Sequence, residues 1–251
     1  MTETDAWGNE PLERPRYHMG MLLAADDFGC EQTYHRRAHA AFVRAVHGAG
    51  TVCGLAVRPT DPPSREVAVD SGLAIDGLGR QMIVPDVQTL ALGDLGGSGG
   101  DTVRVVAIRF VEVPTGHVPV RPEVDVREAT EPSRVVESFE LFLASVRVLD
   151  AHDRRSPRAT PPVSGEELHA WLVDRAIEPC RQAVDVDAGL PLAVVTVPPA
   201  GSITSDHIDN TVRPIVLTVD LVAQLGAELQ RTSSPNWWRR LRDAIGHSAR
   251  R

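Results

Sequence analysis

Three histidines and a cysteine are the residues whose types and spacing could bind a metal ion. His35 and His39 are four residues apart, so on a helix they would share one face, as a pair of zinc ligands does. His47 and Cys53 could supply two further ligands. The helical histidine pair of metalloproteases has a glutamate between its ligands, whereas residues 36–38 here are Arg-Arg-Ala. A metal-dependent hydrolase using His35, His39, His47 and Cys53 is therefore an alternative rather than the leading hypothesis.

Cys53 could also act as a nucleophile, but the sequence around it is typical of a turn. A catalytic thiol needs an electropositive, accessible surrounding and a neighbouring base. Residues 47–55 read HGAGTVCGL, in which Gly48 would end a helix and Gly54 indicates a bulge or a close backbone approach. We interpret Gly48, Gly50, Cys53 and Gly54 as a structural turn from a helix into a strand, with Cys53 buried as a small apolar residue.

The remaining motifs do not indicate a ligand. The glycine-rich residues 77–80 and 96–101 lack the lysine and hydroxyl residue of a phosphate-binding loop. The acidic residues at 123–128 and 206–209 lack the regular oxygen spacing and the glycine of a calcium loop. We therefore expect no cofactor and no enzymatic activity.

The C-terminal residues 232–251 form a basic, aromatic tail. On a helix, its apolar side chains would lie on one face with arginines interleaved. Two adjacent tryptophans are unfavourable in water, so we expect them to be buried on a partner protein, on the chain's own body or at a membrane surface. The candidate partner-binding residues are Trp237, Trp238, Leu241, Ile245, Arg239 and Arg240.

The elements that position these residues begin with a helix and continue as strands. Asp26 and Asp27 favour a helix start, Gly48 favours its end, and apolar residues recur at three- and four-residue steps between them. The segments with strand character are 51–57, 65–86 with turns at 70–72 and 76–79, 102–113, 133–149 and 190–197. Residues 114–132 are charged and rich in proline, which indicates a long outward excursion between two strands.

These elements predict an α+β fold. An N-terminal helix would pack on a mainly antiparallel β-sandwich or barrel, followed by a smaller α/β segment and a C-terminal amphipathic tail. The predicted divisions are an extended arm (1–16), the helix and β-domain (17–150), a linker (151–164), the α/β segment (165–231) and the tail (232–251).

Composition excludes several classes of partner. The formal net charge is −8, whereas a nucleic-acid-binding domain usually has a concentrated basic face. The 3 cysteines, Cys30, Cys53 and Cys180, are an odd number without close pairs, which argues against a disulfide framework. No run reaches the ~18–20 apolar residues of a membrane-spanning helix, and the N-terminal residues lack a secretory signal. We therefore expect a cytoplasmic protein that does not bind nucleic acid.

The first part of the chain contains a series of short motifs formed by Tyr17, Gly20 to Leu23, Asp26 to Phe28, Glu31, Gln32, Tyr34 and His47 to Leu55. In these residues the chain resembles an uncharacterised bacterial family associated with contractile injection systems and other phage-tail-like particles. The resemblance touches most of residues 16–218 and is most specific in roughly the first forty of these. One departure is Ala49, where the family has a larger aromatic residue.

The resemblance implies a structural or accessory part of such a particle, of baseplate, cap or adaptor type. We expect this non-enzymatic protein to contact other protein subunits through residues 1–16, residues 114–132 and the tail. Self-association into a homo-oligomer and a membrane-surface adaptor attached through the tail are open alternatives.

Overall fold

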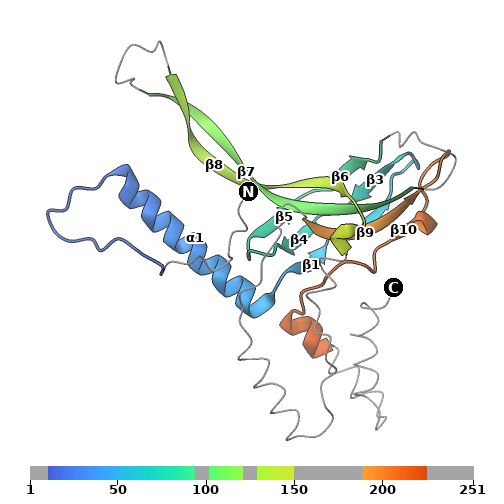
Figure 1. The fold of residues 1–251 in the computed structure, drawn as a ribbon, viewed down its shortest axis with the longest axis horizontal. Helices are drawn as coiled ribbons and strands as arrows, with labels where there is room; N and C mark the ends of the chain where they lie inside the picture. Colours follow the sequence, from blue (N-terminus) through green and yellow to red (C-terminus); the bar gives the residue numbers. More distant parts are fainter. Residues whose placement is uncertain (1–10, 94–101, 121–128, 150–188, 225–251) are drawn as a thin grey trace, which may run out of the picture.

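The computed structural model describes residues 11–93, 102–120, 129–149 and 189–224. Within these residues one long helix is followed by three antiparallel sheets, which confirms the predicted α+β class. Figure 1 shows that the helix and a long β-hairpin both extend away from the sheets on the same side of the molecule. No helix in the described part of the chain is long and apolar enough to span a membrane.

Helix α1 (Ala25–His47) begins and ends where the sequence predicts. At its start, the Asp27 carboxylate accepts a hydrogen bond from the Ala24 N–H at 2.8 Å. Asp26 and Asp27 also place negative charge beside the free N–H groups of the first turn, which stabilises it. At its end, Gly48 has a φ of +72° and its N–H bonds to the Arg44 carbonyl oxygen at 3.0 Å. A side chain is unfavourable at that φ, so glycine suits the position.

Six short strands follow α1 and form two sheets. One sheet has the order β1-β4-β5 and the other the order β2-β3-β6. The turn predicted at residues 70–72 therefore connects two sheets, whereas the turn at 76–79 closes the β4–β5 hairpin. The strands are β1 (Gly50–Gly54), β2 (Val57–Pro59), β3 (Glu66–Val69), β4 (Gly72–Ile75), β5 (Gln81–Val84) and β6 (Gln88–Ala91).

The third sheet contains the longest strands. Its order is β10-β9-β7-β8, formed by β7 (Thr102–Val120), β8 (Ala129–Ala144), β9 (Leu190–Val197) and β10 (Ile208–Asp209). Strand β9 pairs with β7 only from Thr102 to Ile108. Beyond that point β7 and β8 pair with each other alone, so the outer part of the hairpin is a two-stranded ribbon.

Two sequence predictions differ from this architecture. The excursion at 114–132 is not a loop over its whole length, because β7 continues to Val120 and β8 starts at Ala129. In a two-stranded ribbon, each strand has backbone N–H groups that point outward and take no part in the hydrogen bonds between the strands. A proline at such a position removes no hydrogen bond, so prolines are compatible with the ribbon. The segment 51–57 is two strands in two sheets, because Gly54 (φ +64°) and Leu55 (φ +56°) turn the backbone between them.

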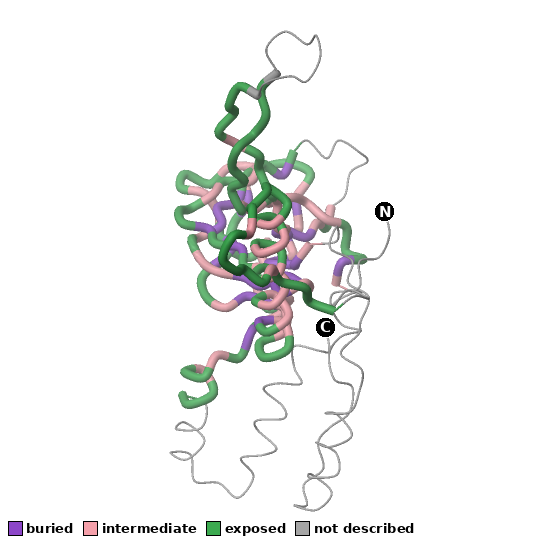
Figure 2. Tube along the Cα trace, turned by 90° about the vertical axis from the view of Figure 1, so that its left-hand side faces the viewer, coloured by how far each residue is buried: buried purple, intermediate pink, exposed green. Residues whose placement is uncertain are grey.

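One hydrophobic core joins the three sheets. Leu55, Val67, Met82, Ile108 and Leu192 come from different parts of the chain and are fully buried together. Each such side chain stabilises the fold by about 1.5–3 kcal/mol relative to exposure. Figure 2 shows the buried residues concentrated in the sheets, whereas the outer hairpin is exposed along its length.

Residues 1–10, 150–188 and 225–251 lie outside the described residues. They include most of the predicted arm (1–16), the linker (151–164), both ends of the α/β segment (165–231) and the tail (232–251). Within the α/β segment, the described residues confirm the strand predicted at 190–197, and residues 219–224 are helical.

Candidate interaction surface

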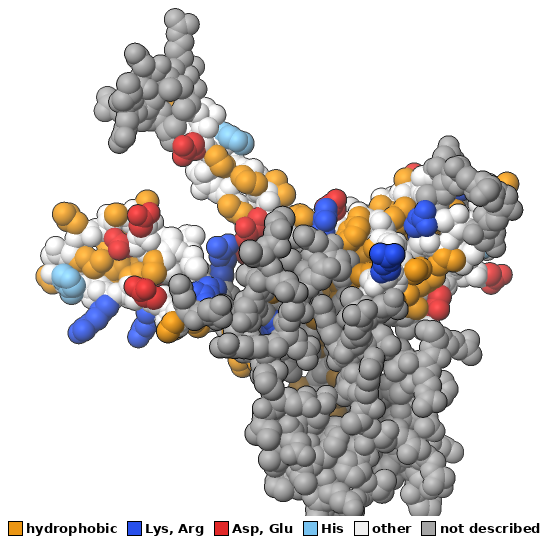
Figure 3. All heavy atoms as spheres, viewed as in Figure 1, with side chains coloured by type: hydrophobic (Ala, Val, Ile, Leu, Met, Phe, Trp, Pro, Cys, Tyr) orange, Lys and Arg blue, Asp and Glu red, His pale blue; other side chains and the backbone are white. Residues whose placement is uncertain are grey.

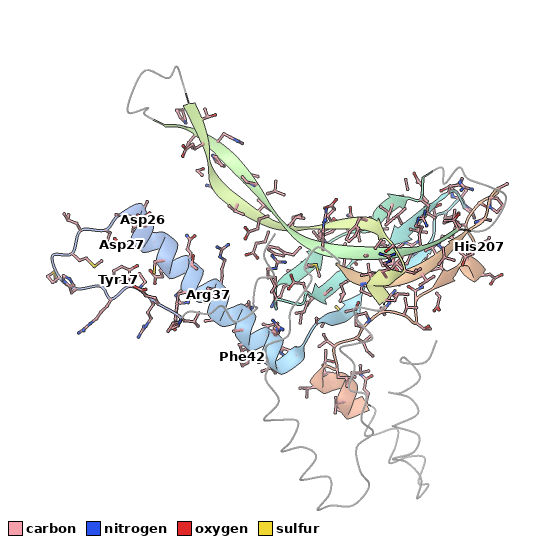
Figure 4. The ribbon with its side chains drawn as sticks, viewed as in Figure 1. Tyr17, Asp26, Asp27, Arg37, Phe42 and His207 are labelled. Carbon is pink, nitrogen blue, oxygen red and sulfur yellow. The ribbon has the colours of Figure 1, made fainter. Side chains whose placement is uncertain are left out.

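The segment before α1 lies against the helix. Residues 11–18 are without regular structure, and contacts with Cys30 and Glu31 connect them to α1. The Cys30 thiol lies 3.9 Å from the Glu13 carbonyl oxygen, and the Tyr17 hydroxyl donates a hydrogen bond to the Glu31 carboxylate. This bond to a carboxylate raises the pKa of Tyr17 to about 12, since the protonated phenol is the donor. Figure 4 shows Tyr17 beside the outer half of the helix.

Helix α1 contacts the sheets through the half that runs from its middle to its C-terminal end. Val43 is its one buried side chain among the described residues, and packs with Ile75 and Val216. Nearby, His39 Nε2 lies 3.2 Å from Gln81 Nε2, and Arg36 forms a 2.8 Å ion pair with Glu112 of β7. The rest of the helix projects from the sheets (Figure 1).

The largest apolar side chains of α1 face solvent, although the end of the helix packs on the sheets as predicted. Phe28 is 51% exposed, Phe42 62% and Val46 58%. The stripe continues into the preceding segment, where Met19, Leu22 and Leu23 are exposed. The helix crosses the sheets only near its end, so most of its apolar side chains lie too far from the core to be buried there.

The outer hairpin carries a second exposed apolar surface. Its exposed valines are Val113, Val118, Val135 and Val136. Glu112 lies directly opposite Glu137, a like-charged pair that disfavours the ribbon in isolation. Figure 3 shows hydrophobic side chains on both the outer part of α1 and the hairpin.

Gly48, Gly50 and Gly54, which the sequence analysis assigned to a structural turn with Cys53, all have positive φ in the structure. A Cβ on Gly54 would overlap the Ser71 carbonyl oxygen, and a Cβ on Gly50 would lie 3.0 Å from the Pro214 carbonyl oxygen. Cys53, however, is exposed and not buried as we predicted. A register shift between Thr51 and Cys53 interrupts the alternation of β1 and turns the Cys53 side chain away from the core.

The alternative metal site is not assembled. His35 Nε2 lies 3.8 Å from Glu31 Oε1 one turn earlier, and His39 contacts Gln81. Among the residues that the structure describes, no three His, Cys, Asp or Glu side chains form a group that could hold a metal ion. His35, His39, His47 and Cys53 are therefore not brought together as a ligand set.

Asn210 and Arg213 connect the C-terminal segment to the first strands. Sequence reasoning considered Asn210 only with Asp206 and Asp209 as a possible calcium loop, and did not single out Arg213. Asn210 Oδ1 accepts a hydrogen bond from the Val57 N–H at 3.0 Å, and its Nδ2 donates to the Val57 carbonyl oxygen at 2.9 Å. Arg213 donates to the Asn210 side chain and to the Gly54 carbonyl oxygen. Partial burial lowers the pKa of Arg213. The Asn-Thr-x-Arg pattern after a short strand was the available signal, and its role is structural.

Most of the other predicted site residues lie in parts of the chain that the structure does not describe. Trp237, Trp238, Leu241, Ile245, Arg239 and Arg240 lie outside the described residues, as do the acidic residues at 123–128. Of the second acidic group, Asp209 accepts a hydrogen bond from the Thr211 N–H at 2.8 Å and thereby shapes the turn that follows β10.

Comparison with known proteins gives distant structural similarity only. No protein-family model and no curated protein matches the sequence. A crystal structure of TssK matches with a TM-score of 0.40 and 12% identity, over 96% of this chain and 57% of that chain. This chain thus spans little more than half the length of that protein.

Two further matches of similarly low sequence identity are chains from larger assemblies of the type VI secretion system. The TssK–TssF–TssG baseplate subcomplex, solved by cryo-electron microscopy, matches with a TM-score of 0.40 and 10% identity, over 95% of this chain and 78% of the matched chain. The baseplate complex matches with a TM-score of 0.41 and 11% identity, over 90% of this chain and 49% of the matched chain. At these TM-scores the similarity does not establish a function for this chain.

Proposed function

We propose that this chain is a non-enzymatic assembly component of a phage-tail-like contractile injection particle, acting in the cytoplasm through protein–protein contacts. The observation that carries the proposal is the exposure of apolar side chains on two elements that project from a well-packed body. Exposed apolar patches of this kind mark interaction surfaces in soluble proteins. The type of particle is suggested by the resemblance of residues 17–55 to the family described above.

The outer hairpin is the first proposed contact. An isolated two-stranded ribbon is marginally stable in water, and this one also places Glu112 opposite Glu137. Its long free edges can pair with a strand of another subunit, since edge strands present unpaired N–H and C=O groups. The exposed valines at 113, 118, 135 and 136 would then be covered by that subunit.

A reconstitution experiment tests the proposal. The chain is mixed with purified sheath, tube and baseplate proteins of a contractile injection system, and complexes are separated by size-exclusion chromatography. We expect a stable complex with at least one baseplate protein, lost when Val118 and Val135 are both replaced by Asp. Ile83→Asp is the matched control, because Ile83 is exposed on β5 of the body. The absence of any complex with particle proteins would contradict the proposal.

A further inference from the structure

Strand β8 has a free edge along its whole length in the described part of the chain. It is the outermost strand of the order β10-β9-β7-β8, and its backbone pairs with β7 alone. Residues 130–137 are all exposed, on both faces of the ribbon (Figure 2). The unpaired N–H and C=O groups of such an edge can pair with an added strand. Exposure on both faces therefore indicates strand addition rather than a partner that rests on one face.

The opposite edge of the ribbon suits an added strand less well. It belongs to β7, and β9 already occupies it as far as Ile108. Backbone groups of a strand alternate in direction, and Pro114 and Pro119 occupy positions of opposite direction, so one of the two lacks an outward N–H. In β8 the one proline is Pro132, which removes at most one donor. The β8 edge is therefore the longer and more complete of the two.

The charged residues along this edge differ in sign between the two faces. Glu131 and Glu137 lie on one face and Arg134 on the other, because side chains point to alternate faces along a strand. In the described part of the chain these three side chains form no ion pair. Glu112, directly opposite Glu137, is paired with Arg36 of α1, so this face already accommodates one guanidinium. A second basic side chain beside Glu137 would complete that arrangement.

The same charges disfavour a second copy of β8 as the added strand. Residues 130–137 contain two acidic side chains, Glu131 and Glu137, and one basic side chain, Arg134. Two copies of this stretch cannot place an opposite charge beside all three residues, because each copy offers one arginine for two glutamates. A segment of different sequence can satisfy all three, since opposite charges at facing positions stabilise strand pairing and like charges destabilise it. Charge complementarity therefore favours another protein as the occupant.

We propose that the β8 edge binds an extended segment of another protein with a basic, an acidic and a basic side chain at successive third positions. The two basic side chains lie beside Glu131 and Glu137, and the acidic one beside Arg134. An apolar side chain of the segment covers the exposed Val135. The order of charges is the same in both chain directions, so it holds for a parallel or an antiparallel strand. The inference rests on the proposed function and states which kind of segment the hairpin recognises.

The first experiment uses the full purified chain and two backbone-cyclised hairpin peptides as probes. One strand of the first peptide carries arginine, glutamate and arginine at successive third positions, and the second peptide has these charges reversed. Fluorescence anisotropy at low salt should show saturable binding of the first peptide. The second should bind at least about tenfold more weakly, because three facing pairs change from attractive to repulsive. Equal affinities, or no saturable binding of either peptide, would overturn the proposal.

The second experiment reverses the charges on the chain. A variant with Glu131→Arg, Arg134→Glu and Glu137→Arg should prefer the second peptide over the first. Glu66→Arg on β3 is the matched control, because Glu66 is exposed on the body and the net charge changes by the same amount in both variants. The control should keep the original preference, and thermal unfolding checks that both variants are folded. An unchanged preference in the triple variant would contradict the proposed recognition.

The third experiment identifies the edge by disulfide formation in a chain with Cys30, Cys53 and Cys180 replaced by Ser. A single cysteine is then introduced as Arg134→Cys or Thr115→Cys, at directly opposite positions of β8 and β7. The peptide carries cysteine in place of its central glutamate. A strand added to β8 lies about 4.8 Å from β8 and about twice as far from β7, so Arg134→Cys should crosslink faster. Faster crosslinking of Thr115→Cys would place the peptide on the β7 edge and overturn the proposal.

Two further outcomes would show a different occupant and also overturn it. A dimer of the chain alone, lost in the triple variant, would show that a second copy covers β8. Tighter binding of the first peptide after deletion of residues 232–251 would show that the chain's own tail competes for the edge. These measurements need no particle protein, whereas the reconstitution above needs no peptide. A failure here with a successful reconstitution would therefore leave the proposed function in place and move the contact to another surface.

Discussion

The sheet body and the two projecting elements are stabilised in different ways. In the body, Leu55, Ile108 and Leu192 are fully buried in one core shared by three sheets. On α1 and the outer hairpin, Phe42 and Val135 are more exposed than buried. The same kinds of side chain therefore hold the fold together in one region and stay available for contacts in the other.

The two regions also differ in how their polar groups are used. In the body, Asn210 satisfies both backbone groups of the buried Val57. On the projecting elements, an ion pair joins Arg36 of α1 to Glu112 of β7, and both side chains remain about half exposed. Exposed ion pairs contribute little to the free energy of unfolding. A hydrogen bond to a buried polar group contributes more, because without a partner that group would have lost its water at a desolvation cost. We therefore expect changes in the body to affect folding, and changes on the projections to affect association.

The largest contrast should come from removing apolar volume in each region. Leu192→Ala leaves a cavity in the core and should lower the free energy of unfolding by about 2–5 kcal/mol. Val135→Ala on the hairpin should change it by less than about 0.5 kcal/mol, because the side chain is exposed. Urea denaturation of both variants measures the difference. Equal losses would show that the hairpin belongs to the same cooperative unit as the body.

A second contrast uses two glycines. Gly54→Ala forces a side chain into a left-handed conformation and against the Ser71 carbonyl oxygen, so we expect a loss of about 2–4 kcal/mol. Gly29 lies within α1, and a Cβ there would meet nothing within 4 Å. Gly29→Ala should stabilise the helix by about 0.5–1 kcal/mol. Circular dichroism during denaturation reports both, and destabilisation by Gly29→Ala would indicate that its surface is already occupied.

Local signals in the sequence predicted the elements of both regions. Asp26, Asp27 and Gly48 marked the ends of α1, because capping and left-handed backbone depend on a few neighbouring residues. The strand at 190–197 was recognisable as a continuous apolar run. In this respect the fold class followed from short-range patterns.

What the sequence did not predict depends on contacts between distant residues. The stripe with Phe28 and Phe42 has the periodicity of a packed helix, and periodicity does not say whether the surface that covers it belongs to the same chain. The bulge that exposes Cys53 requires the register of β1 against β4. Asn210 reaches Val57 across 153 residues, and the local Asn-Thr-x-Arg pattern does not identify Val57 as its partner.

The Asn210 contact gives a third contrast with the projections. Asn210→Ala leaves the N–H and C=O of Val57 without partners, and should cost about 2 kcal/mol. Arg36→Ala breaks an exposed ion pair and should cost less than about 1 kcal/mol. Thermal unfolding at low and high salt separates the two, since only the Arg36 contribution should decrease with salt. A salt-independent loss in Arg36→Ala would mean that its aliphatic stem, and not its charge, holds α1 to β7.

The smallest expected effect is a titration within the projecting region. The bond to Glu31 raises the pKa of Tyr17 from 10.0 to about 12, because the carboxylate binds the phenol and repels the phenolate. A raised folded-state pKa means that this bond stabilises the arm fully below pH 10, and that the contribution is lost as the pH rises through 12. Absorbance at 295 nm in a Tyr34→Phe chain follows Tyr17 alone, and Glu31→Gln should bring its midpoint back toward 10. Asp26→Asn, which removes a charge one turn away and leaves the bond, is the control and should shift the midpoint much less. A Tyr17 midpoint near 10 in the unaltered chain would show that the arm does not rest on α1, and that the helix is open to solvent on that side as well.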